Sequence, residues 1–194
     1  MARNRGKRLE RLLDFVHEIY RNRGEADITK IELRTKVDRR TGRMIYLART
    51  NFDYSGVIRG GRAIGVEAKE TAGQTRLYID PMGKTGLKIH QIEGLIRWGK
   101  LGAIAGVIWL VDWDEAYWIG HKFLEWFMKE IYDKPEKPGG KPIKSIHLDI
   151  VKKFCWSIMK DGILDYIPAS RADQIDPRDS TLPGGQQCLI APPK

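Results

Sequence analysis

The stretch of residues 52–71 carries three charged side chains whose types and spacing could do chemistry on a phosphodiester. Asp53 opens the stretch, a glycine-rich turn follows, and Glu67 and Lys69 stand two positions apart after the turn. Two carboxylates and a strand carbonyl, that of Ala68, are hard oxygen ligands of the kind that suits Mg²⁺, for which Mn²⁺ can substitute. Such a metal acidifies water and offsets charge on a phosphate, while Lys69 would orient the water or stabilise that charge. The stretch is therefore interpreted as the active strand pair of a metal-dependent nuclease.

The strand geometry expected here would gather these charges at one place. Side chains alternate between the two faces of a strand, so Glu67 and Lys69 project together while Val66 projects toward a core. If Asp53 lies on the neighbouring strand, across the turn at residues 60–61, its carboxylate reaches the same place as that of Glu67. The alternative is a plain salt bridge between Glu67 and Lys69, which contributes little stability on a protein surface.

The same residues carry a resemblance to a known family. Asp53, Glu67 and Lys69 match the signature of the PD-(D/E)xK nuclease superfamily. Over about residues 4–130 the chain resembles RecU-type Holliday junction resolvases, in the words NRGKRLE at 4–10, DYSGVIRGGRAIGVEAKET at 53–71 and HQIEGL at 90–95. The resemblance implies an endonuclease that cuts four-way DNA junctions with Mg²⁺ as a homodimer and leaves 5′-phosphate ends.

The resemblance also implies two further site residues. A glutamate on the first helix contributes to the metal site in such resolvases, and Glu10 stands at the matching position, with Glu18 as the second candidate on that helix. A glutamine that helps to position the attacking water or the backbone near the metal corresponds to Gln91. The alternative for Gln91 is an amide on the surface of a helix.

Basic residues are concentrated in the first quarter of the chain. The formal net charge is +9, and residues 1–50 contain 14 Lys and Arg against 7 Asp and Glu. This distribution predicts a polyanionic partner, DNA, contacted by a basic arm at residues 1–7 and by a hairpin with its turn at Thr41-Gly42. The segment before Asp53 is shorter than the junction-entering stalk of the family and lacks its proline-containing stretch. The predicted DNA-binding residues are Arg3, Arg5, Lys7, Lys36, Arg39, Arg40, Arg43, Arg49, Arg59 and Arg62.

Periodic apolar residues predict the elements that must position these groups. The fold expected is α/β, a restriction-endonuclease-like core with a mixed central sheet of about five strands flanked by helices, plus a basic β-hairpin projection. Residues 1–132 would form the nuclease core, 133–144 a linker, and 145–194 a C-terminal helix over 145–161 with an irregular tail. Helices are expected over 8–21, 87–101 and 121–132, and strands over 28–37, 43–50, 76–80, 103–111 and 116–119, besides the strand pair within residues 52–71.

Other classes of protein fit the sequence less well. Two cysteines, Cys155 and Cys188, are too few for a disulfide framework and are expected as thiols in a reducing cytoplasm. The longest apolar run, residues 103–111, is too short to span a bilayer, so no membrane association is expected. Two alternatives stay open: a nuclease of the same superfamily acting on duplex or other branched DNA, and a non-catalytic DNA-binding architectural protein.

Overall fold

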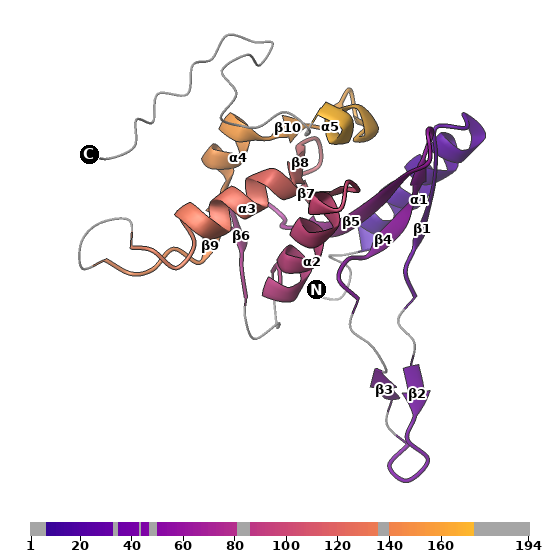
Figure 1. Cartoon of the computed structure of the whole chain (residues 1–194), viewed down its shortest axis with the longest axis horizontal. Helices are drawn as coiled ribbons and strands as arrows, with labels where there is room; N and C mark the ends of the chain where they lie inside the picture. Colours follow the sequence, from indigo (N-terminus) through magenta and orange to yellow (C-terminus); the bar gives the residue numbers. More distant parts are fainter. Residues whose placement is uncertain are drawn as a thin grey trace.

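The computed structural model describes residues 7–32, 35–42, 44–46, 50–80, 86–135 and 140–172 (Figure 1). At its centre is a mixed six-stranded sheet in the order β1-β4-β5-β7-β8-β10. Neighbouring strands run antiparallel except for β5 and β7, which are parallel. The predicted α/β class is confirmed, with six strands where about five were expected. The strands are β1 (Ala26–Lys30), β4 (Tyr54–Ile58), β5 (Arg62–Glu70), β7 (Ile104–Leu110), β8 (Ala116–Gly120) and β10 (Trp156–Ser157).

Helices cover both faces of this sheet. On one face α1 (Lys7–Asn22) and α5 (Ile167–Ala172) pack over a cluster that includes Leu13, Ile28 and Ile64. On the other face α2 (Ile89–Lys100), α3 (His121–Glu130) and α4 (Leu148–Phe154) pack over a cluster that includes Val107 and Phe127. Every residue of β7 is buried, as the unbroken apolar run predicted for a strand covered on both faces. None of the helices in the described part of the chain is long and apolar enough to cross a membrane.

A small hairpin projects from the body of the molecule below β1 and β4 (Figure 1). It pairs β2 (Thr35–Val37) with β3 (Met44–Tyr46) as a ladder of its own, outside the central sheet. The prediction of a single strand over 28–37 is therefore wrong, because β1 ends at Lys30 and β2 begins at Thr35. The chain leaves the sheet after Lys30 because its partner strand begins opposite, at Tyr54. Of the strand predicted over 43–50, the part described as strand is β3.

Two other predicted elements differ in the structure. β6 (Arg76–Tyr78) was expected as a core strand, yet it pairs with β9 (Ser145–His147) in a separate two-stranded sheet. The helix predicted over 145–161 is confined to α4, because the chain turns extended at Cys155 and continues into β10. A turn at Asp161 and Gly162, both at positive φ, then joins β11 (Met159–Lys160) to β12 (Ile163–Leu164).

The segment after the predicted linker contributes to the core. Ile146 and Val151 lie in the apolar cluster beneath α2 and α3, and Leu164 and Tyr166 lie in the one beneath α1. The tail predicted as irregular begins at Ile163, and this is wrong for its first part, which forms β12 and α5; from 173 onward it lies outside the described residues. The division of the chain at 133–144 stays a prediction.

Candidate active site

Asp53 and Glu67 lie side by side at one end of the β4–β5 pair. Tyr54 is the register partner of Val66, and the N–H of Asp53 donates to the carbonyl of Val66 over 3.0 Å. Asp53 directly precedes β4, and its Oδ2 accepts the N–H of Ala68, so its carboxylate lies beside the residue that follows Glu67 in β5. The turn that joins the strands contains Gly60 and Gly61, both at positive φ, where the sequence predicted it.

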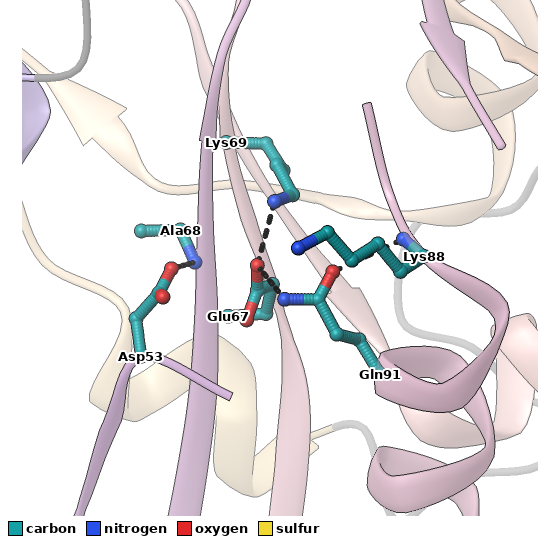
Figure 2. Close-up of polar contacts among 6 residues, drawn as sticks. All are labelled: Asp53, Glu67, Ala68, Lys69, Lys88 and Gln91. Carbon is teal, nitrogen blue, oxygen red and sulfur yellow. Dashed lines mark hydrogen bonds and ion pairs between the residues drawn. The ribbon is translucent and has the colours of Figure 1, made fainter. Parts of the chain in front are cut away.

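The carboxylate of Glu67 is buried and bonded through one oxygen only (Figure 2). Its side chain is 0% exposed, and Oε1 accepts hydrogen bonds from Gln91 Nε2 at 2.6 Å and Lys69 Nζ at 2.7 Å. Oε2 is buried and has no hydrogen-bond partner among the described residues. Burial raises the pKa of Glu67 to about 7. The Lys69 ammonium acts to lower this pKa, and the Asp53 carboxylate acts to raise it by a smaller amount. Glu67 thus has one buried carboxylate oxygen, Oε2, that a cation could bind.

Gln91 reaches Glu67 from the first turn of α2. Its Oε1 accepts the backbone N–H of Lys88 at 3.0 Å, which orients the carboxamide so that its Nε2 faces Glu67. Gln91 is only 6% exposed, so the alternative of a surface amide is wrong. The carboxamide of Gln91 thus binds the backbone at the start of α2 through Oε1 and the carboxylate of Glu67 through Nε2.

The donors at this place fit a divalent cation. Asp53 Oδ2 accepts the N–H of Ala68 at 3.1 Å. The N–H and C=O of one strand residue point to the same side, so the Ala68 carbonyl is directed to the side that Asp53 occupies. Two carboxylates, one with an unpartnered oxygen, and one carbonyl make the partial oxygen shell that Mg²⁺ accepts together with water. Within the described ranges, no three His, Cys, Asp or Glu side chains group as a metal cluster, so Glu10 does not complete a triad here.

Glu10 lies in the first turn of α1, the end of the helix near β5, but its carboxylate contacts Lys30. Its carboxylate forms an ion pair with Lys30 at 2.7 Å, with nearly half of each side chain exposed. The N–H of Leu9 donates to Glu70 Oε2 at 3.3 Å and so fixes the start of α1 at the end of β5. Glu18 lies eight residues, about 12 Å, further along the helix. Of the two predicted candidates, only Glu10 is near the strand that carries Glu67.

Those of the predicted DNA-binding cations that the structure describes lie in the hairpin, at the start of α1 and at the β4–β5 turn. Arg39 and Arg40 are exposed in the turn of the β2–β3 hairpin, and Lys7 opens α1. Arg59 and Arg62 lie at the β4–β5 turn, the end of the pair opposite Asp53, and donate to the backbone carbonyls of Gly24 and Gly102 at 3.0 and 2.6 Å. The structure does not bring these two to the site. Lys36 lies in β2, and Arg3, Arg5, Arg43 and Arg49 lie outside the described residues.

Sequence reasoning missed Lys88 and Glu70. Figure 2 shows the Lys88 side chain running along Gln91 in the direction of Glu67. Residues three apart share a helix face, so the position of Lys88 three before Gln91, at the start of α2, was a signal that could have revealed it. Glu70 directly follows the Glu67-x-Lys69 triplet, but its bond to α1 depends on a contact 61 residues away and leaves no local pattern.

Comparison with known proteins gives a family for the chain, and similar chains occur among solved structures. The family model described as Recombination protein U (RecU) matches residues 4–171, further than the resemblance over about 4–130. Among solved structures, the chain is similar to Hjc, a Holliday junction resolvase from Archaeoglobus fulgidus, at 15% identity with a TM-score of 0.43, covering 76% of this chain and 93% of that one. A search of curated proteins gave no match.

Proposed function

Because the chain belongs to the RecU family of Holliday junction resolvases, we propose that it cuts four-way DNA junctions by paired, Mg²⁺-dependent phosphodiester hydrolysis. The observation that carries this mechanism is the buried carboxylate of Glu67, with one oxygen bonded to Lys69 and Gln91 and the other unpartnered beside Asp53. A fully buried, half-satisfied carboxylate is costly unless a cation or proton completes it. This cost supports a metal site there.

Asp53, Glu67 and the carbonyl of Ala68 would hold the metal. The bound ion would supply acidified water and charge compensation at the phosphate. Gln91 keeps Glu67 in place through Oε1, which leaves Oε2 for the ion. The Lys69 ammonium, 2.7 Å from Oε1, lies where it can orient the nucleophile or donate to a phosphate oxygen. These residues bind and orient, so the chemistry depends on their fixed geometry.

Glu10 would serve as the third carboxylate once its pair with Lys30 opens. That pair is nearly half exposed on both sides, and exposed pairs contribute about 0–1 kcal/mol, so a metal or DNA can displace it. Glu10→Gln should therefore weaken metal-dependent cutting while Glu18→Gln, on the same helix, should not. Equal losses in the two variants would remove Glu10 from the site.

The substrate supports a homodimer. A four-way junction has approximate two-fold symmetry and needs nicks in two opposed strands, whereas one site built on Asp53 and Glu67 makes one nick. Two copies related by a two-fold axis would present two sites at once. Mixed dimers of wild type and Asp53→Asn should then nick a cruciform plasmid without resolving it. Sedimentation that shows only monomer, even with junction DNA present, would contradict this assembly.

The decisive experiment compares substrates and metals in one assay. A labelled four-way junction and a linear duplex of the same sequence are incubated with Mg²⁺, Mn²⁺ or EDTA. We expect cutting of the junction with either metal, none in EDTA, and little cutting of the duplex. Equal cutting of both substrates would point to a general nuclease. Tight binding without cutting in any metal would point to an architectural protein.

A further inference from the structure

An exposed tryptophan and an arginine form a fixed pair outside the catalytic set. Trp113 lies in the turn between β7 and β8 and is 73% exposed, although it is among the largest apolar side chains. The guanidinium carbon of Arg8 lies 3.4 Å from the centroid of its ring. One face of the indole is therefore covered by a cation, and most of the rest of the side chain faces solvent.

Hydrogen bonds hold this pair in its geometry. Arg8 Nη2 donates to the carbonyl of Trp113 at 2.9 Å, and the N–H of Trp113 donates to Asp112 Oδ1 at 2.8 Å. Arg8 thus contacts both the ring and the backbone of the same residue. A rigid aromatic side chain loses little entropy on binding, so its open face is prepared for a flat partner.

The pair lies at the active end of the sheet. β5 and β7 are parallel, with Glu70 opposite Leu110, so the turn that holds Trp113 leaves the sheet at the end where β5 carries Glu67 and Lys69. The start of α1, which carries Arg8, is bound to Glu70 through the N–H of Leu9. Trp113 follows Leu110 by three residues, a reach of about 10 Å at strand spacing. The indole therefore lies at the same end of the sheet as Glu67 and Lys69.

We propose that Trp113, seated on Arg8, is a stacking platform for an unpaired or unstacked nucleobase of the bound DNA, next to the strand being cut. This inference rests on the proposed function. Aromatic side chains bind bases through their π-faces without regard to sequence, and a guanidinium against the opposite face adds a cation–π contribution. A branch point, where base stacking is interrupted, offers such a base. Phosphate contacts by the neighbouring cations would position the strand, and the indole would select its distorted part.

The test separates stacking from mere packing. Trp113→Leu keeps apolar bulk and removes the π-face, whereas Trp113→Phe keeps a smaller π-face. Trp156→Leu is the matched control, because this partly exposed tryptophan lies on the edge strand β10 opposite Trp118, outside the turn that carries Trp113. Junction and duplex affinities are measured in EDTA, where no cutting occurs. Junctions with 2-aminopurine at successive positions around the branch point report stacking by loss of fluorescence.

We expect Trp113→Leu to bind the junction about 5- to 150-fold more weakly than wild type, with a smaller change for duplex. Quenching at one or two 2-aminopurine positions should disappear in Trp113→Leu and survive in part in Trp113→Phe. Trp156→Leu should match wild type in both measurements, and thermal unfolding should show that the Trp113 variants remain folded.

The outcomes distinguish this inference from the proposed function. If wild type binds and cuts junctions while Trp113→Leu keeps its affinity and its quenching pattern, the stacking platform is wrong and the nuclease stands. Equal losses in Trp113→Leu and Trp113→Phe that follow a fall in melting temperature would show a purely structural tie between α1 and the turn. If wild type itself neither binds nor cuts junctions, both the proposed function and this inference are wrong.

Discussion

The β4–β5 pair and the β2–β3 hairpin both carry charges that the proposed activity needs, but they hold them in opposite ways. Glu67 is fully buried, and its bonds to Lys69 and Gln91 fix it in one position. Arg39 and Arg40 are exposed, and the hydrogen bonds described near them shape the backbone: Asp38 accepts the N–H of Arg40 at 3.0 Å and the hydroxyl of Thr41 at 2.7 Å. The first region fixes side chains, and the second fixes a turn.

This difference separates chemistry from binding. A transition state needs donors and ligands in place before the substrate arrives, because reorganising them costs free energy at the moment of reaction. Backbone phosphates need only nearby positive charge, which flexible side chains supply through the release of counterions. The molecule therefore holds the charges proposed for catalysis, Glu67 and Lys69, buried or partly buried on β5, and presents part of its basic charge on a projection. Changes in the first region should affect rate, and changes in the second should affect affinity.

Neutralising either site carboxylate should give the largest effect. Asp53→Asn or Glu67→Gln should lower junction cutting by on the order of 1000-fold or more, because the metal loses a ligand. Binding in EDTA should be unchanged or tighter, since a carboxylate facing phosphate repels it when no metal is present. Single-turnover cleavage and equilibrium binding on one labelled junction measure the two quantities. Glu93→Gln, an exposed carboxylate on α2, is the control. Cutting at the wild-type rate by Asp53→Asn would end the assignment.

The buried acid should also make stability depend on pH. The folded pKa of Glu67 is raised from 4.5 to about 7, so its contribution to stability is full below pH 4.5 and is lost as the pH rises through 7. Between those limits the metal-free protein should lose about 3 kcal/mol relative to Glu67→Gln, which cannot titrate there. Urea unfolding of both proteins in EDTA from pH 4.5 to 8 measures this difference. A difference that stays constant over that range would mean that Glu67 is ionised throughout.

Gln91 tests how much of the chemistry depends on its hold on Glu67. Gln91→Leu removes the donor to Oε1 and should lower cutting by about 10- to 100-fold, the usual effect of losing a partner that orients a metal ligand. Metal affinity, measured by calorimetry, should fall by a similar factor, while junction affinity in EDTA should not. Gln91→Asn keeps the amide on a shorter side chain, so its cutting rate and metal affinity should lie between those of wild type and Gln91→Leu. Loss of junction affinity without loss of metal affinity would place Gln91 at the DNA instead.

The sequence was sufficient for the parts of the site and fold that depend on local periodicity. Alternation along residues 64–69 correctly placed Glu67 and Lys69 on one face and Val66 on the other, since Val66 packs beneath α1 and Glu67 faces α2. The glycine turn at 60–61 correctly predicted the strand pair β4–β5, although Asp53 lies directly before β4 and not on it. These inferences work because a strand has a fixed period and a tight turn has few solutions.

The rest depended on partners far away in the chain. A strand was predicted over 76–80, but β6 and β9 are three residues each and meet through pairs such as Leu77 with Ile146, so the sequence did not show that they pair. β10 has two residues and joins the sheet only through β8. The ion pair of Glu10 with Lys30 likewise joins a helix to a strand. Such contacts follow from tertiary packing, which local propensity does not encode.

The hairpin should give the smallest effect, and one confined to binding. Arg39→Ser together with Arg40→Ser removes two exposed cations from a turn whose backbone Asp38 shapes, so the fold should survive. Each lost phosphate contact should flatten the log–log dependence of junction affinity on salt by about one unit, hence about two units for the pair. Cutting of fully bound junction should keep its wild-type rate. The control removes two lysines of equal charge, Lys129 and Lys134, near the end of α3 and away from the hairpin (Figure 1). An unchanged slope in the arginine variant would mean that the hairpin faces away from DNA, and a slower cut at saturation would mean that it acts on the site as well.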